Sequence, residues 1–137
     1  RVNREGAAQV AEVLKRQGVD LLAIDLVGYD IHIDGSFLMI DHDLALVDPF
    51  GLPFSFLEKL KELKVRTVEI TPADNKWIIN SLAVAPGELI MPEGATNQTL
   101  DRLAAHGIRW TVLPYGAMQL NGGGLHCSTT PLIRDPA

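Results

Sequence analysis

The chain contains a single cysteine in 137 residues, which excludes an internal disulfide bond. A lone thiol is typical of proteins in reducing compartments, so we expect a cytoplasmic protein. Apolar runs are also short: none reaches the roughly 18 to 20 residues of a membrane span, and no signal peptide is visible. The sequence opens at Arg1 without a methionine. These absences predict a non-membrane chain that is a fragment or a processed product.

An excess of basic residues is missing too. Twelve Lys and Arg stand against 17 Asp and Glu, the net charge is -5, and the basic residues are scattered. This argues against nucleic acid and anionic membranes as partners, and a mildly acidic chain is better suited to a cationic ligand. The 47% hydrophobic and 21% charged content is typical of a globular protein, and the length predicts one domain, residues 1–137.

Hydrophobic periodicity predicts a mixed α/β chain. Helical spacing alternates with short aliphatic runs that are typical of strands, and turn residues separate them. The first predicted elements are a helix over 4–17 stopped at Gly18, a strand over 19–27, strands 36–40 and 44–49 joined by a turn at 41–43, a helix over 53–64 and a strand over 65–70.

The order strand, strand, helix, strand then recurs. Equivalent positions are 44, 43 and 43 residues apart: Leu38 and Leu82, Leu60 and Leu103, Val65 and Ile108. A nearly constant offset indicates an internal structural repeat. We therefore predict two complete ββαβ units, at about 37–71 and 81–114, preceded by the end of one unit and followed by the opening strand of another in "GGLHCSTTPL".

The only thiol, Cys127, lies in "NGGGLHCSTTPLIRD". A lone cysteine is commonly a small buried residue, but three preceding glycines leave room for a ligand or another backbone to approach. A phosphate-binding loop is excluded, because no helix with Lys-Ser or Lys-Thr follows. In an extended segment His126 and Cys127 point to opposite faces, so we interpret His126 as a packing or hydrogen-bonding residue and expect a catalytic partner from another strand.

A second polar stretch is "YDIHIDGSFLMID". In an extended segment His32 and Asp34 lie on one face, where an imidazole could transfer protons beside a carboxylate that holds a cation. On spacing alone, a polar turn at a strand end is the simpler interpretation. A metal site is not expected, because the histidines and the cysteine lack zinc-type pair spacing. His42 is expected in the hairpin turn, and His106 at a helix C-terminus.

Together these stretches resemble the guanidino-group-modifying enzymes, the pentein superfamily. "HIDGSFLMID" is similar to that family's His-x-Asp-x-x-Phe stretch, and "NGGGLHCSTTPLIRD" is similar to its glycine-rich nucleophile segment; "SLAVAPGELIMP" and "RVNREGA" add to the likeness. The resemblance implies an α/β fold of ββαβ units around a pseudo-fivefold axis. The family's Glu-Gly-Gly-Asp-like segment and an earlier acidic residue are absent, so the chain resembles the C-terminal half of such a propeller.

The resemblance also implies roles. Cys127 would be the nucleophile and His32 the general acid and base; Asp34 would bind the guanidinium, Arg1 a substrate carboxylate, and Gly123 and Gly124 would leave room for a flat cation beside the sulfur. It implies a hydrolase of arginine or methylated arginine that needs no cofactor or metal. Two alternatives stay open: an amidinotransferase that passes the amidino group to an amine acceptor, and a catalytically incomplete fragment or binding module. A half propeller exposes apolar faces, so we expect self-association or a complementary chain.

Overall fold

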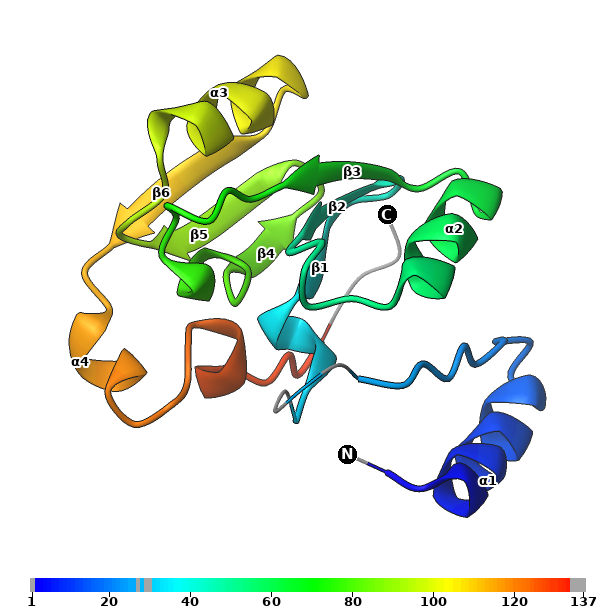
Figure 1. The fold of residues 1–137 in the computed structure, drawn as a ribbon. Coiled ribbons are helices and arrows are strands. Elements are labelled where there is room, and N and C mark those ends of the chain that lie inside the picture. The colour runs from blue at the N-terminus through cyan, green and yellow to red at the C-terminus, as the bar shows by residue number, and fades with distance from the viewer. Residues whose placement is uncertain (1, 27, 29–30, 134–137) are drawn as a thin grey trace.

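The computed structural model describes residues 2–26, 28 and 31–133. Within them the chain forms four α-helices, three 3-10 turns and six strands in two sheets (Figure 1). The elements are α1 Arg4–Lys15, η1 Ile33–Gly35, β1 Phe37–Asp41, β2 Leu44–Val47, α2 Phe54–Glu62, β3 Arg66–Glu69, η2 Lys76–Ile78, β4 Leu82–Ala85, β5 Glu88–Pro92, α3 Asn97–Ala105, β6 Arg109–Leu113, α4 Gly116–Gln119 and η3 His126–Ser128.

The two sheets have the same topology. In the first, β1 pairs antiparallel with β2 and β2 pairs parallel with β3. In the second, β4, β5 and β6 repeat this arrangement. Each first strand has a register irregularity near its end, and an ion pair closes each unit, Arg66 with Asp43 and Arg109 with Glu88. The predicted α/β class with repeated ββαβ units is confirmed.

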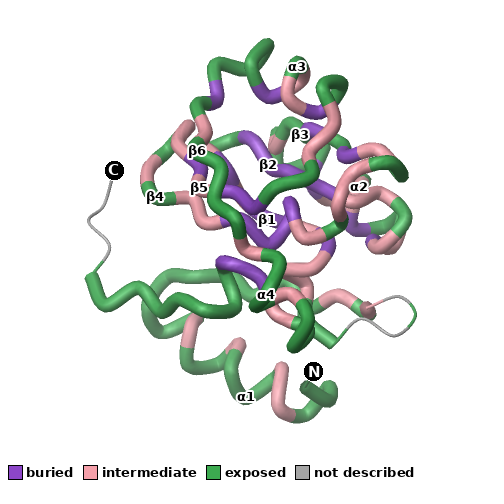
Figure 2. The backbone as a smooth tube through the Cα atoms, turned by 90° about the vertical axis from the view of Figure 1, so that its left-hand side faces the viewer, coloured by how far each residue is buried: buried purple, intermediate pink, exposed green. Residues whose placement is uncertain are grey.

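The core explains why the two units stack. Leu44 and Leu46 on one face of β2 belong to a large cluster shared with the second unit, including Leu89 and Leu103. The opposite face of β2 packs with Phe56 and its neighbours under α2. All four residues of β2 are buried, so this strand needs cover on both sides. Figure 2 shows buried segments along β1, β2 and β5, whereas β6 is largely exposed.

The N-terminal segment differs from its prediction. Helix α1 forms as expected, capped by Asn3, whose Oδ1 accepts the N–H of Gly6 at 2.8 Å, but none of its residues is buried. The predicted strand over 19–27 is wrong for residues 19–26, which form no strand, and residue 27 lies outside the described residues. The aliphatic pattern favours a strand, but a strand requires a ladder partner and no described strand pairs with this segment.

The described helices include none with the length and apolar character needed to cross a membrane.

Asp74 joins the end of the first unit to helix α3 of the second. Its Oδ2 accepts from Thr71 N at 2.6 Å, Thr71 Oγ1 at 2.8 Å and Thr99 Oγ1 at 2.7 Å, and its Oδ1 accepts from Thr96 N at 2.5 Å. Burial raises the pKa of Asp74, but the hydrogen bonds from Thr96, Thr99 and Thr71 outweigh it and leave the pKa below the usual 3.8. The charged carboxylate therefore stabilises the junction.

Replacing this carboxylate tests its contribution. We expect Asp74→Asn to lower the free energy of unfolding by about 1–2 kcal/mol at pH 7, because an amide offers one acceptor oxygen instead of two. The loss is no larger because the site is partly exposed to solvent. Since the folded pKa is lowered, the stabilisation is present above pH 3.8 and is lost as the pH falls through the folded pKa. Urea unfolding at several pH values measures this.

The exposed Asp101→Asn on α3 is the matched control, and we expect it to leave stability nearly unchanged. A difference between wild type and Asp74→Asn that stays constant from pH 7 down to pH 2 would contradict the assignment.

Candidate active site

A pocket of about 300 Å³ lies where three segments meet, before β1, before β4 and near the C-terminus. Figure 1 shows the η1 turn and the C-terminal segment meeting below the sheets. The residues of the pocket that carry charge, a nucleophile or an aromatic ring are His32, Asp34, Asp48, Lys76, Trp77 and Cys127.

The structural repeat explains why these segments converge. Asp34 precedes β1 and Asn80 precedes β4, so they occupy similar places at the start of successive units. Asn80 contacts residues 46 positions before it and 47 positions after it, close to the repeat length. Stacked units bring their equivalent turns to one edge, and the pocket forms there.

Asp34 is fixed by the η1 turn. The neighbouring Ile33 packs against the cluster under α2, and Ser36 N donates to Ile33 O at 2.8 Å. The side chain of Asp34 is 19% exposed. The spacing of His32 and Asp34 predicted an extended segment here. The structure has a 3-10 turn instead, which still leaves both residues in the same pocket.

Cys127 is fixed by the η3 turn. Leu125 is buried before it, and Ser128 N and Oγ both bond to Gly124 O, at 3.2 and 2.9 Å. The predicted strand in "GGLHCSTTPL" is wrong, because η3 and irregular backbone occupy residues 123–133. The expectation that His126 and Cys127 diverge is wrong for the same reason, since a tight turn does not alternate faces.

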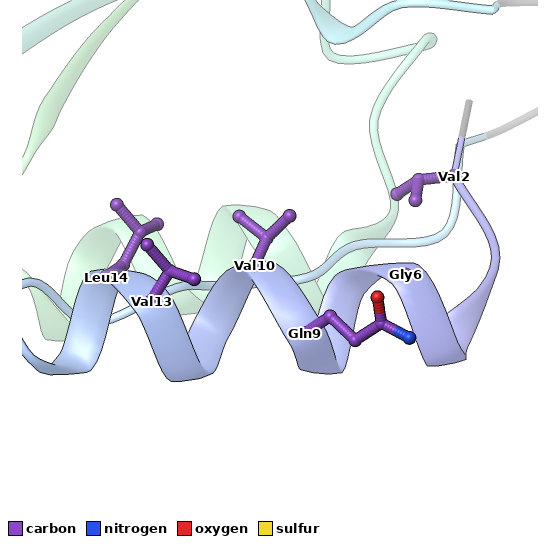
Figure 3. A pocket seen from close by; sticks show the side chains of 6 residues that line it. All are labelled: Val2, Gly6, Gln9, Val10, Val13 and Leu14. Atoms are coloured by element: carbon purple, nitrogen blue, oxygen red, sulfur yellow. The ribbon is translucent and has the colours of Figure 1, made fainter.

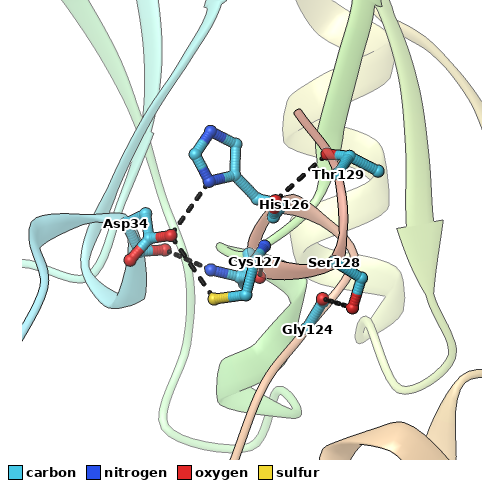
Figure 4. Close-up of polar contacts among 7 residues, drawn as sticks. Asp34, Gly124, His126, Cys127, Ser128 and Thr129 are labelled. Atoms are coloured by element: carbon cyan, nitrogen blue, oxygen red, sulfur yellow. Dashed lines mark hydrogen bonds and ion pairs between the residues drawn. The ribbon is translucent and has the colours of Figure 1, made fainter. Parts of the chain in front are cut away.

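Both side chains instead reach one carboxylate (Figure 4). Nδ1 of His126 lies 2.9 Å from Oδ2 of Asp34, and the Cys127 thiol donates to the same oxygen at 3.5 Å. The interpretation of His126 as a hydrogen-bonding residue is confirmed. The cysteine is exposed rather than buried in the core, which favours the reactive interpretation over a small packing residue.

The electrostatics of the pocket centre on Asp34. Burial raises the pKa of Asp34. Hydrogen bonds from His126, Cys127 and Asn80, together with the charge of His126, lower it by more, so the pKa lies below the usual 3.8. Asp34 is therefore an anion at neutral pH. A partly buried anion beside a nucleophile is suited to a cation that carries several N–H donors.

The other predicted residues have different positions. Gly124 is buried against Asn80, and Gly123 lies beside Cys127, whereas of the three glycines 122–124 it is Gly122 that lines the pocket. Its φ of 80° turns the chain towards η3. Arg1 lies outside the described residues. The substrate-binding roles of Gly123, Gly124 and Arg1 remain predictions.

Sequence reasoning missed Asp48, Lys76, Trp77 and Asn80. Asp48 follows the buried strand β2, and an acidic residue at a strand end was a signal that could have drawn attention to it. Asn80 gave no local signal, because its partners are distant in the sequence. His42 lies in the hairpin turn and His106 caps α3, as predicted. Among the described residues, no group of three or more His, Cys, Asp or Glu is arranged to hold a metal ion.

The sequence matches no family model and no curated protein. Solved structures do match. SxtG, an amidinotransferase from Microseira wollei in the saxitoxin biosynthetic pathway, has a TM-score of 0.81 at 18% identity, over 99% of this chain and 43% of that one. DDAH from Pseudomonas aeruginosa has 0.73 at 20%, over 93% and 46%. The N-terminal domain of ArgZ, an arginine dihydrolase from cyanobacteria, has 0.77 at 16%, over 93% and 46%.

The chain thus spans less than half the length of these three neighbours. Their common architecture agrees with the ββαβ units and the stacked sheets described above. Over that part of their length the chain has the fold of these solved structures, which is the fold that the resemblance to the pentein superfamily predicted.

Proposed function

We propose that this chain supplies the cysteine nucleophile, Cys127, of a hydrolase that acts on the guanidino group of arginine or a methylated arginine. One observation carries the proposal: the thiol of Cys127 and the carboxylate of Asp34 lie 3.5 Å apart in a pocket that His32 also lines. Neighbours with this fold support chemistry on a guanidino group in general, since they include an arginine dihydrolase, DDAH and amidinotransferases.

Substrate binding begins at Asp34. A guanidinium is planar and can donate two parallel hydrogen bonds to one carboxylate. It takes over the oxygen that His126 and Cys127 share, and Asp48 supplies a second negative charge to the pocket. Orientation against the sulfur then lowers the entropic part of the barrier.

The bound cation also activates the nucleophile. A free thiol has a pKa of about 8.5 and is mostly protonated at neutral pH. In the free protein the Cys127 thiol donates to Asp34. When the guanidinium occupies Asp34, the thiol loses this acceptor and gains a neighbouring positive charge, which favours the thiolate.

The reaction then proceeds in two halves. The Cys127 thiolate attacks the guanidino carbon, and the tetrahedral adduct expels ammonia or an amine that His32 protonates. The resulting amidino-thioether is attacked by water, from which His32 removes a proton. The C–S bond breaks, the ureido product leaves and the thiolate is restored. The chemistry requires no metal or organic cofactor, and a reducing compartment such as the cytoplasm keeps the thiol free.

The first test is labelling of Cys127 followed by intact mass. We expect a haloacetamidine, which carries a guanidinium-like cation, to react roughly tenfold or more faster than neutral iodoacetamide after correction for intrinsic reactivity, because Asp34 binds the cation. Asp34→Asn should remove this preference, since it keeps the shape and removes the charge. Equal slow labelling by both reagents would contradict the proposal and favour an incomplete fragment or binding module.

Asp43→Asn is the matched control, because Asp43 is an exposed carboxylate that pairs with Arg66 away from the pocket. Turnover then separates the two reaction types. Formation of a ureido product from arginine or a methylated arginine, lost in His32→Ala, supports hydrolysis. Product that appears only with an added amine acceptor would assign amidinotransfer instead.

We also infer that a second polypeptide surface covers helix α1, either another copy or a complementary chain. Val10 and Val13 of the helix are 49 and 54% exposed, and Val2, which precedes the helix and lines the same pocket, is 68% exposed. Figure 3 shows these side chains together with Leu14 beside a shallow apolar pocket. A regular amphipathic helix without buried residues is typical of an interaction surface.

Sizing in solution tests this inference. We expect a mass above the 14.9 kDa of one chain by light scattering at micromolar concentration, because exposed valines gain free energy when buried. Val13→Asp should shift the population to monomer, whereas Ala8→Asp on another side of the helix should not. A monodisperse wild-type monomer would count against self-association.

A further inference from the structure

Asn80 is a buried polar residue that links the two halves of the candidate site. Its Nδ2 donates to the carbonyl oxygen of Asp34 at 3.2 Å, and its Oδ1 accepts the backbone N–H of Cys127 at 3.1 Å. Its own carbonyl accepts the N–H of His126 at 3.0 Å. Asn80 is 1% exposed. Two segments separated by 93 residues are therefore held by one amide.

Gly124 permits this arrangement. A Cβ added to Gly124 would lie 2.8 Å from Cβ and Cγ of Asn80, closer than carbon atoms normally approach. A Cβ added to the neighbouring Gly123 would meet only Cys127 Cβ at 3.7 Å, an ordinary contact. The glycine at position 124 thus allows the C-terminal segment to lie directly against the amide.

We propose that Asn80 is a positioning residue that sets the distance between the Cys127 sulfur and the Asp34 carboxylate. The inference rests on the proposed function and deepens it. The amide fixes one point on each segment, the N–H of Cys127 and the carbonyl of Asp34. Without the side-chain amide, the η3 turn still keeps the hydrogen bond from the His126 N–H to the backbone carbonyl of Asn80. The Cys127 thiol, however, loses its fixed position relative to the Asp34 carboxylate.

The isosteric change Asn80→Asp separates this role from packing. It preserves shape and an acceptor for the Cys127 N–H, but an ionised carboxylate cannot donate to Asp34 and places negative charge near the sulfur. Ser81→Ala is the matched control. Ser81 is equally buried and its hydroxyl donates to Ile78 at 2.6 Å, outside the pocket lining.

The readout is the pH dependence of Cys127 labelling by iodoacetamide, which needs no guanidinium. In Asn80→Asp we expect the half-maximal pH to rise by about one unit, which is a tenfold slower rate at neutral pH, because the thiol loses its fixed position and a carboxylate lies near it. The other ionisable groups of the site remain in both variants, so their contributions are common to the comparison: His32, Asp34, Asp48, Lys76 and His126.

An unchanged profile in a folded Asn80→Asp, or an equal change in Ser81→Ala, would overturn the proposal. If the wild type shows no amidine preference, the proposed function fails, while the iodoacetamide profiles still decide the role of Asn80.

Hydrogen exchange on the wild-type protein gives a test that does not depend on a variant folding. Cys127 is exposed, so without the bond to Asn80 its amide would exchange at nearly the rate of an unstructured peptide. We expect exchange slower by roughly a hundredfold or more, as for a hydrogen-bonded amide in a stable region. Unprotected exchange would overturn the proposal.

Discussion

The burial of strand β2 on both faces is the constraint on which this structure depends. Its side chains alternate between the cluster under α2 and the cluster shared with the second unit. Each fully buried leucine contributes about 1.5–3 kcal/mol, so neither face tolerates exposure to water. A ββαβ unit with a strand of this kind cannot be covered by its own helix alone, and stacking of units follows.

Stacking of the units brings together functional groups that lie in different units. The turns before successive units meet at one edge, and each supplies a different group: the carboxylate of Asp34, the amide of Asn80 and the thiol of Cys127. The turns of Asp34 and Cys127 are partly exposed, whereas Asn80 follows the core residues Ile78 and Ile79 and is buried. Their precision comes from a few directed hydrogen bonds and from the glycine that lets two of the segments approach.

Charge in the pocket is arranged for a cation. Asp34 is held anionic by donors that a guanidinium can replace, and Asp48 lies in the same pocket. The same carboxylate accepts a hydrogen bond from the Cys127 thiol, so under the proposed function a bound cation would take this acceptor away from the thiol. The proposed cationic ligand would be attracted by these two carboxylates, whereas an anion would be repelled by them.

The sequence by itself determined the repeated units, and it indicated His32, Asp34 and Cys127 as candidate reactive residues. The offset from Leu60 to Leu103 and the alternation of strands are local patterns, because periodicity records which face of an element is buried. The motif around His32 and Asp34 and the glycines before Cys127 indicated the site without geometry. The strand expected over 19–27 failed in its described part because a strand depends on a partner elsewhere in space.

Only the tertiary structure decided how the site is assembled. Extended backbone around residue 127 would have separated His126 from Cys127, but the η3 turn directs both at Asp34. The role of Asn80 depends on contacts that are one repeat away in each direction, and no local pattern contains them. The sequence specifies which side chains are present, whereas the distances among Asp34, Asn80 and Cys127 result from the stacking of the units.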